Sequence, residues 1–401
     1  MSAPELPAPT TPVEAAARAR DADRQLMLLL ALQFAFGLAF STFVLLPKIL
    51  AASLHAGPAA IGRVMAMFAY AGVAAALLTG RRAARRGGKR LIIEGTLLMI
   101  ASALGYLAVD RVGPLAMALR AAHGAAYAMV FVTGSAIAAD LAPPGRMART
   151  MALYGTSNLV TNALAPLLVE PLVDRFGPAA AYVTAAVASA VAGALATRLV
   201  EEAPAGQAPA AGGSLGAVLR RGRAVRLTLA IGLAGVALSA MFSFSQLMAL
   251  SLGMRQVSGF FVAYTAAVLL VRLVLGGLID RVGPQRASVG ALLLYAAVVF
   301  SMRFLGVFGL SALGAAFGVA HGFLYPAAMA LSVTDLPAAE RGPMLTLANA
   351  GFIGGGAFVG PLGAFAARAG YPALYALCAA GALAAAALLW RWPIAGPRAV
   401  P

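Results

Sequence analysis

The chain has 401 residues, of which 61% are hydrophobic and only 11% are charged. Soluble domains carry about 25% charged residues, so this composition excludes an ordinary soluble protein and indicates a polytopic membrane protein. The formal net charge of +16 does not indicate nucleic-acid binding, because the positive residues lie in loops between apolar runs. The single cysteine, Cys378, excludes an internal disulfide.

The chain begins with a Pro- and Ala-rich stretch of mixed charge, residues 1–25, which predicts a disordered tail. No short apolar segment with a cleavage site follows it, so a signal peptide is not expected. Apolar segments of about 20 residues follow, which is long enough to cross a bilayer. Six are expected near residues 26–47, 59–80, 91–109, 114–139, 147–170 and 178–197. Six more are expected near residues 227–252, 258–279, 287–305, 307–332, 343–366 and 371–391.

A change of composition separates the two sets of spans. Residues 199–226 contain acidic residues, prolines and glycines and end in a basic stretch, which predicts a linker lying on the membrane surface. The expected parts are therefore a tail (1–25), a six-helix bundle (26–198), a linker (199–226), a second bundle (227–392) and a short tail (393–401).

Positive residues set the expected orientation. Segments on the side of the N-terminus carry roughly three times as many Lys and Arg residues as segments on the other side. We therefore expect both termini and the linker to be cytoplasmic, in a multi-pass protein of the cell membrane, most readily a bacterial inner membrane. The expected surroundings are the lipid bilayer, and a monomer is expected.

The two halves of the chain repeat each other. Gly80 and Gly87 recur as Gly276 and Gly283, and Pro166 recurs as Pro361, at offsets of about 195 residues. His123-Gly124-x-x-Tyr127 recurs as His321-Gly322-x-x-Tyr325 at a similar offset. The chain is therefore expected to consist of two similar halves.

The loop segment Gly276–Arg286 reads G-x-L-x-D-R-x-G and ends on an arginine. It resembles the signature that the major facilitator superfamily carries between helices 8 and 9. Gly80–Arg90 resembles the twin of this signature between helices 2 and 3, except that Ala84 replaces the aspartate. The resemblance covers nearly the whole chain. It implies an all-α membrane protein with 12 transmembrane helices in two pseudo-symmetric halves.

The loop signature implies a gate. Its candidate residues are Gly276, Asp280, Arg281, Gly283 and Arg286, with Gly80 and Gly87 in the twin loop. Gly283 is expected where a tight loop needs a positive φ. Asp280 could approach the N-terminus of a neighbouring helix, or pair with Arg146 or Arg149, and so hold the cytoplasmic side closed. The alternative is that Asp280 and Arg281 are solvated loop charges.

Two further motifs resemble those of proton-coupled antiporters. Leu119–Ala126 resembles the R-x-x-x-G motif of helix 4. A Gly-Pro motif that belongs in helix 5 is clear only in helix 11, where its residues are Gly351, Gly356, Gly360 and Pro361. Ala165-Pro166 in helix 5 lacks the glycines.

Arg120, His123 and Tyr127 are spaced so that they share one face of helix 4. A buried arginine in a span costs about 2.5–3.5 kcal/mol on insertion scales, so Arg120 should face protein or a water-filled cavity. The alternative is that Arg120 snorkels outward or bonds a helix carbonyl. We expect Arg120 to bind an anion and His123 to carry a proton, since histidine titrates near neutral pH.

His321 and Tyr325 repeat two of these residues on helix 10, with Gly318 in place of the arginine. In the superfamily, helices 1, 4, 7 and 10 line the central cavity, so the resemblance implies that both histidines face it. The rival explanation is that the His-Gly pairs are packing motifs, with Gly124 and Gly322 allowing close helix contact. No Cys or carboxylate accompanies the histidines, so metal binding is not expected.

Other polar residues in the spans could complete the cavity: Gln33, Gln246, Asn158, Asn162, Asn349 and Arg272. Each is equally a candidate for a helix-packing hydrogen bond, and Arg272 could snorkel to the inner face. No acidic residue falls at the expected centre of a span. The cavity therefore suits an anionic, zwitterionic or neutral solute better than a cation.

The sequence contains no phosphate-binding loop, metal cluster or nucleophile constellation, so neither ATP hydrolysis nor another enzyme activity is expected. The predicted function is secondary transport of a small organic solute by alternating access, with a proton gradient and no cofactor. The antiporter-like motifs favour efflux. The alternatives are proton-coupled uptake of an organic acid or nutrient, and a non-transporting sensor or assembly protein on the same fold.

Overall fold

The structure is a computed structural model that describes residues 12–143, 145–200, 220 and 222–391, and within this part all regular secondary structure is helical. Helix α1 begins at Pro12, so residues 12–25, predicted to be disordered, are the first turns of α1. The prediction was wrong there because the prolines end at Pro12, and the Ala- and Arg-rich segment that follows has high helix propensity. Most of the linker and the C-terminal tail lie outside the described residues.

The first half of the chain supplies helices α1 to α7. Its elements are α1 (Pro12–Thr42), η1 (Phe43–Leu45), α2 (Leu46–Leu54), α3 (Pro58–Arg86), α4 (Gly88–Gly105), η2 (Tyr106–Ala108), α5 (Pro114–Asp140), α6 (Met147–Phe176) and α7 (Ala179–Ala196). The first predicted span corresponds to the chain from α1 to α2, and the next five correspond to α3 to α7.

The second half supplies helices α9 to α16. Its elements are α9 (Gly222–Ser251), α10 (Ser258–Val274), α11 (Gly276–Val282), α12 (Pro284–Ser301), η3 (Met302–Phe304), α13 (Leu305–Phe308), α14 (Leu310–Val333), α15 (Ala338–Gly354), η4 (Gly355–Phe358) and α16 (Val359–Trp390). The last two predicted spans meet inside α16, where Gly370 has non-helical backbone angles and kinks the helix.

Nine helical stretches of the described chain are long and apolar enough to cross a membrane. One of them, Glu340–Trp390, is 51 residues long and contains two predicted spans. The shorter apolar helix α10 and the proline-containing helix α6 occupy the two other predicted positions. The 12-helix all-α membrane fold is therefore confirmed.

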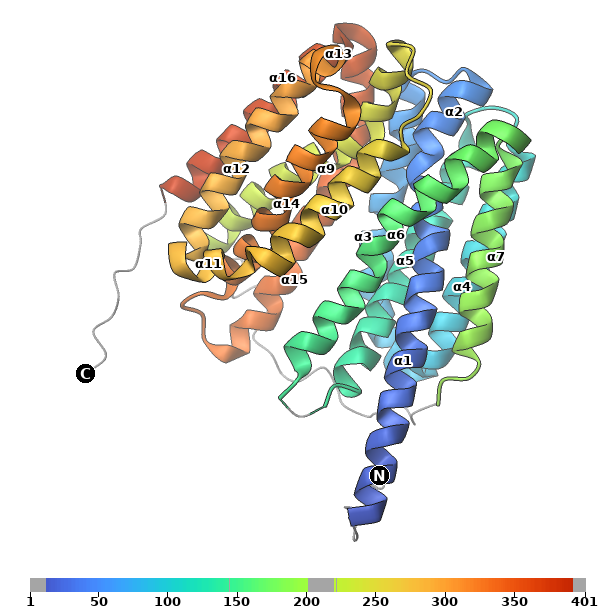
Figure 1. The fold of residues 1–401 in the computed structure, drawn as a ribbon, viewed down its shortest axis with the longest axis vertical. Coiled ribbons are helices and arrows are strands. Elements are labelled where there is room, and N and C mark those ends of the chain that lie inside the picture. Colours follow the sequence, from blue (N-terminus) through green and yellow to red (C-terminus); the bar gives the residue numbers. More distant parts are fainter. Residues whose placement is uncertain (1–11, 144, 201–219, 221, 392–401) are drawn as a thin grey trace.

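The packing of the helices shows the internal repeat. In the first half α3 packs on α5, α4 on α5 and α7, and α1 on α6 and α7. The second half repeats each contact, with α10 on α14, α12 on α14 and α16, and α9 on α15 and α16. Figure 1 shows the two bundles, one blue to green and the other yellow to red. Equivalent helices make equivalent contacts because each half is one copy of the same six-helix unit.

The halves meet along a seam in which α3 packs on α16, α6 on α10, and α2 on α9. The molecule has two ends, which we name by their helices. The α2 end holds α2 and α13, and the opposite end holds α11 and the start of α1 (Figure 1). We call the latter the α11 end.

The two repeated loops have the same backbone conformation. Gly87 joins α3 to α4 with φ 82° and ψ 144°, and Gly283 joins α11 to α12 with φ 89° and ψ 144°. Residues with a side chain rarely adopt these angles, so glycine is needed at both positions. The predicted positive φ of Gly283 is confirmed.

Candidate functional site

Helix α5 places Arg120 against His123, one turn further on. The Arg120 Nη1 atom lies 3.2 Å from His123 Nδ1, and the two side chains are 6% and 0% exposed. A guanidinium nitrogen can only donate, so Nδ1 accepts this hydrogen bond and carries no proton of its own. This contact therefore requires the neutral form of His123.

Aromatic rings enclose this pair. The Arg120 guanidinium lies 5.0 Å from the centre of the Phe68 ring, a distance typical of a cation–π contact. Three phenylalanines face the imidazole of His123 at steep angles: Phe40, Phe43 and Phe68. The pair is therefore inside the first half, screened from solvent in this conformation.

Two polar atoms of the pair have no hydrogen-bond partner: Arg120 Nε and His123 Nε2. Buried polar groups are nearly always paired, so unpaired ones need an explanation such as a role in binding or proton transfer. Both atoms are donors when His123 is neutral. The pair can therefore donate to an acceptor that the structure does not contain.

Tyr127, one further turn along α5, lies between aromatic rings and stacks on Phe131 with ring centroids 5.2 Å apart. Its hydroxyl lies near the side chain of Asn158 on α6. Tyr325 on α14 lies near Tyr127 across the seam. The structure thus brings together the two repeat-related tyrosines that the sequence singled out.

A hydrogen-bond network behind Tyr127 joins α1 to α6. Gln33 Nε2 donates to Asn158 Oδ1 at 3.2 Å, and the Tyr154 hydroxyl donates to Gln33 Oε1 at 2.8 Å. Tyr154, near the start of α6, is 1% exposed and was not among the residues predicted for the site. Its spacing in the sequence could have indicated it, because Tyr154 lies one turn before Asn158 and the two residues therefore share one helix face.

Two other predicted residues make contacts within the protein. Ser41 on α1 donates to Asn162 Oδ1 at 3.0 Å, which ties α1 to α6. Gln246 Nε2 donates to the carbonyl oxygens of Val44, at 2.8 Å across the seam, and of Phe242, at 2.7 Å. Gln246 therefore makes helix-packing hydrogen bonds, which was the alternative to a role in the cavity. One of these bonds crosses the seam between the halves.

The second half holds a matching aromatic and cationic cluster. His321 is 6% exposed, its Nδ1 has no partner, and its ring lies 5.8 Å from Tyr264 and 5.7 Å from Phe352. Arg272 on α10 lies 5.9 Å from the centre of the Tyr325 ring, and its Nε also has no partner. The cluster therefore combines an arginine, a histidine and a tyrosine as the first half does, but takes its arginine from a different helix.

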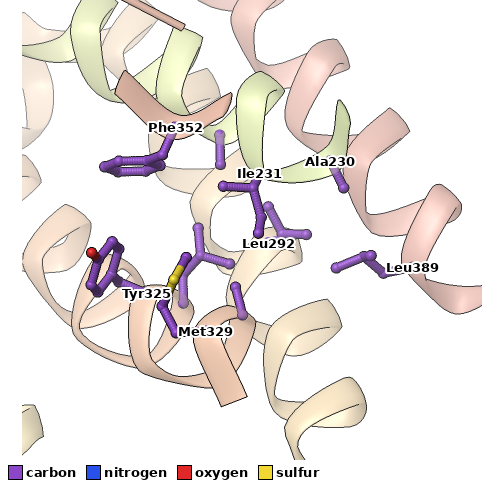
Figure 2. Close-up of a pocket in the computed structure, with 10 residues that line it drawn as sticks. Ala230, Ile231, Leu292, Tyr325, Met329, Phe352 and Leu389 are labelled. Carbon is purple, nitrogen blue, oxygen red and sulfur yellow. The ribbon is translucent and has the colours of Figure 1, made fainter. Parts of the chain in front are cut away.

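Tyr325 connects this cluster to α15, because its hydroxyl donates to Asn349 Oδ1 at 2.7 Å. Figure 2 shows Tyr325 and Phe352 at one side of a pocket that reaches between α9, α12 and α14. The rest of its lining is aliphatic apart from Met329. The pocket is therefore small and mostly apolar.

The repeated glycines allow helices to touch. A Cβ on Gly124 would collide with the backbone of Phe68 on α3, and a Cβ on Gly322 would lie 2.9 Å from the Cβ of Val271 on α10. Gly318, at the position equivalent to Arg120, packs against the backbone of Tyr264. No side chain fits there, so the second half cannot repeat the arginine. Close packing explains the glycines of the His-Gly pairs, but not the unpaired nitrogen atoms of the histidines.

The Gly-Pro segment spans the seam. Gly351 packs against Thr228 on α9, whereas Gly356 and Gly360 pack against Ala69 and Ala66 on α3. Pro361 is exposed. The motif therefore brings helices of both halves into close contact.

The loop signature lies at the α11 end. Gly276, Asp280 and Arg281 are in α11, Gly283 is the joint, Arg286 is in α12, and Gly80 is in α3. The side chain of Asp280 lies outside the described residues, so its contact with Arg146 or Arg149 stays a prediction. Arg281 and Arg286 are exposed.

A buried ion pair that was not predicted from the sequence lies at the α2 end. Lys48 Nζ lies 2.7 Å from Glu170 Oε1 and 3.2 Å from Asp174 Oδ1. The predicted spans 26–47 and 147–170 placed Lys48 just outside one span and Glu170 at the end of another. A lysine within an otherwise apolar run was the signal, because such a charge needs a buried partner.

The sequence profile of the Major Facilitator Superfamily matches residues 28–308 and 256–401. The chain belongs to this superfamily. Solved structures share its fold: a variant of the nucleoside transporter NupG has 14% identity and a TM-score of 0.79, with 91% of this chain and 99% of that chain covered. The human organic anion transporter MFSD10 has 17% identity and a TM-score of 0.68, covering 92% and 99%. The xylose transporter XylE from E. coli has 15% identity and a TM-score of 0.73, covering 93% and 96%.

No curated protein matches the sequence. Membership of the superfamily makes the chain a multi-pass membrane protein and a secondary transporter rather than an enzyme. Within the described residues no group of three His, Cys, Asp or Glu side chains lies close enough to hold a metal ion.

Proposed function

We propose that this secondary transporter exports a small organic solute in exchange for protons, with Arg120 and His123 as the coupling pair. The observation that supports this most directly is the 3.2 Å contact between Arg120 Nη1 and His123 Nδ1. The contact requires an unprotonated Nδ1, so a proton on that atom breaks it. Proton binding and the present geometry therefore exclude each other.

The same contact gives a route to coupling. Arg120 stays charged, so it holds an anion but cannot carry a proton, whereas the imidazole of His123 can bind and release one. A second positive charge on His123 is opposed by Arg120 beside it. An anionic group bound at Arg120 offsets this repulsion, and the two ligands thereby affect each other's binding.

The proposed substrate is anionic, zwitterionic or neutral. Arg120 and Arg272 are cationic, and Glu170 is the one buried carboxylate among the described residues. The facing tyrosines, Tyr127 and Tyr325, and their amide partners, Asn158 and Asn349, would contact its polar groups. The printed names of the structural neighbours, a nucleoside transporter and an organic anion transporter, fit this range.

Export is proposed because the R-x-x-x-G segment and the Gly-Pro segment resemble antiporter motifs. Proton-coupled uptake is the second candidate, because helix 5, where the Gly-Pro motif belongs, lacks its glycines. The proposed orientation places the α11 end and both termini in the cytoplasm, on the strength of the Lys and Arg bias.

The test begins with a ligand. A thermal-shift screen of the purified protein against small organic acids, nucleosides and dipeptides identifies a compound that stabilises it. Flux of this compound is then measured in proteoliposomes with and without an imposed pH gradient. His123→Gln is expected to keep exchange but to lose gradient-driven accumulation, because glutamine hydrogen-bonds but does not titrate.

The matched control is His321→Gln, which changes the repeat-related histidine. This variant is expected to respond to the gradient while its apparent affinity for substrate falls. A full gradient response in the His123→Gln variant would remove His123 as the proton carrier. The direction of transport is tested in the wild type by imposing the pH gradient first one way and then the other. Substrate that moves against the proton flow indicates export, and substrate that moves with it indicates uptake.

A further inference from the structure

Glu170, on α6 of the first half, reaches across the seam to the start of α10 in the second half. Its Oε1 accepts a hydrogen bond from the Val257 backbone N–H at 2.7 Å, and its Oε2 accepts one from the Ser258 N–H at 2.8 Å. Val257 is the N-cap residue of α10 and Ser258 is its first residue. The carboxylate therefore caps, from outside, a helix of the opposite half.

The cap combines two favourable terms. The N-terminus of a helix carries unpaired N–H groups and a partial positive charge, so a carboxylate there is stabilising. Hydrogen bonds to a charged acceptor are also roughly twice as strong as neutral ones. No side chain of α10 itself fills this role, because Val257 has no polar side chain.

Lys48 belongs to the same half as Glu170, so the ion pair between them does not itself join the halves. Its effect is to keep the buried Glu170 ionised and aimed at α10. Asp174, the other acidic group at Lys48, is half exposed and makes only the longer 3.2 Å contact. The link between the halves thus consists of the two bonds from α10 to Glu170.

The link can be opened at low cost to either half. If α10 moves away, Glu170 keeps Lys48, and the freed N–H groups of α10 become accessible to water. A buried pair that lost one member would instead leave an unpaired charge, at a cost of several kcal/mol. This arrangement suits a contact that must form and break in every transport cycle.

We propose that Glu170 is a positioning residue for transport, which holds the two halves together at the α2 end by capping α10. The proposal rests on alternating access by this transporter, and not on proton coupling or on the identity of the substrate. It assigns closure of the α2 end to the cap, with the Gln246–Val44 bond as a secondary contact in the same seam.

The test measures distances at both ends of the full-length protein in lipid nanodiscs, without substrate and at constant pH. The only cysteine is first removed by Cys378→Ser. Spin labels on Ala52→Cys and Leu252→Cys, exposed positions of opposite halves, then report on the α2 end. A second pair, Met147→Cys and Val282→Cys, also exposed, reports on the α11 end.

Glu170→Gln is expected to lengthen the distance at the α2 end and shorten that at the α11 end. A glutamine amide keeps one acceptor for two N–H groups and loses the charge, so the ratio of open to closed molecules should rise by about tenfold or more. A local loosening of the structure would lengthen the first distance and leave the second unchanged. That result would overturn the proposal, as would unchanged distances at both ends.

Two variants separate the cap from the ion pair. Asp174→Asn removes a charge from the same cluster but leaves the cap, so its distances should match the wild type. The exchange Lys48→Glu with Glu170→Lys keeps an ion pair but aims an ammonium, which has no acceptor, at the N–H groups of α10. We expect the α2 end of this double variant to stay open.

Closure of the α2 end in the exchange variant would show that the ion pair, and not the cap, holds the halves together. If Glu170→Gln does not fold, Glu170→Asp replaces it, because the shorter side chain keeps the charge but withdraws it from α10. Glu170→Asp should change both distances in the same directions as Glu170→Gln, but by less. The gradient-driven flux assay tests the proposed coupling separately, so the two proposals fail independently.

Discussion

At the scale of single residues, spacing along a helix was the most informative feature of the sequence. Arg120 and His123 were expected on one face of a span, and the structure brings their nitrogens to 3.2 Å. Neighbours within one helix follow from the helical repeat alone. The aromatic rings around them come from three other parts of the chain, and only the packing of those parts identifies them.

Gly124 gives a prediction at this scale. Gly124→Ala places a methyl group against the Phe68 backbone. Backbone atoms cannot move aside by a change of rotamer, so α5 and α3 must separate. We expect a loss of stability of about 1–3 kcal/mol, seen as a lower midpoint of thermal unfolding in detergent. Gly155→Ala is the control, because its Cβ meets nothing within 4 Å. An equal midpoint for both variants would contradict the close contact.

At the scale of elements, the bounds of the spans were predicted closely, but the first turns of α1 were not. The predicted spans 114–139 and 178–197 correspond to α5, Pro114–Asp140, and α7, Ala179–Ala196. Hydropathy locates the membrane-crossing part of a helix. It does not show where a helix continues into water, as α1 does at its start, because local propensity decides that.

The joint between α11 and α12 gives the element-scale prediction. Gly283→Ala forces a side chain into φ 89° and ψ 144°, at a strain of roughly 1–3 kcal/mol. The expected results are a lower unfolding midpoint and lower yield of inserted protein. Gly277→Ala, in α11 with open space at its Cβ, should be neutral or slightly stabilising. If both alanines behave alike, backbone conformation is not the reason for Gly283.

At the scale of the whole molecule, the two halves contact each other at several points along the seam. The contacts described between them include Glu170 with α10, Gln246 with Val44, and Tyr70 with the Ala357 carbonyl at 3.1 Å. The first two lie at the α2 end. In the proposed mechanism these contacts close the α2 end in one state of an alternating-access transporter.

Orientation gives the whole-molecule prediction. With the α11 end in the cytoplasm, Arg111→Cys, in the exposed turn before α5, should react with an impermeant thiol reagent added outside intact cells. Arg281→Cys, exposed in α11, should react only after the cells are opened. Both variants are made with Cys378→Ser, so that the native thiol does not contribute. The reverse pattern would invert the orientation.

The sequence alone determined the class of fold, the number of spans and the repeat. Each of these depends on local quantities, namely the length of apolar runs, the placement of glycine and the offset between similar segments. It also indicated Arg120, His123, Tyr127 and their partners in the second half as candidates, because a polar group in a span must be satisfied by something.

Only the tertiary structure decided what satisfies them. Tyr127 meets Asn158, Tyr325 meets Asn349, and Glu170 meets α10, all through contacts between residues far apart in the sequence. In a bilayer, helix packing depends on shape and on a few hydrogen bonds rather than on the pattern of apolar residues, since lipid is as apolar as the helices. Glu170 looked from the sequence like the polar end of a span, and it became a link between the halves only when α10 was placed beside it.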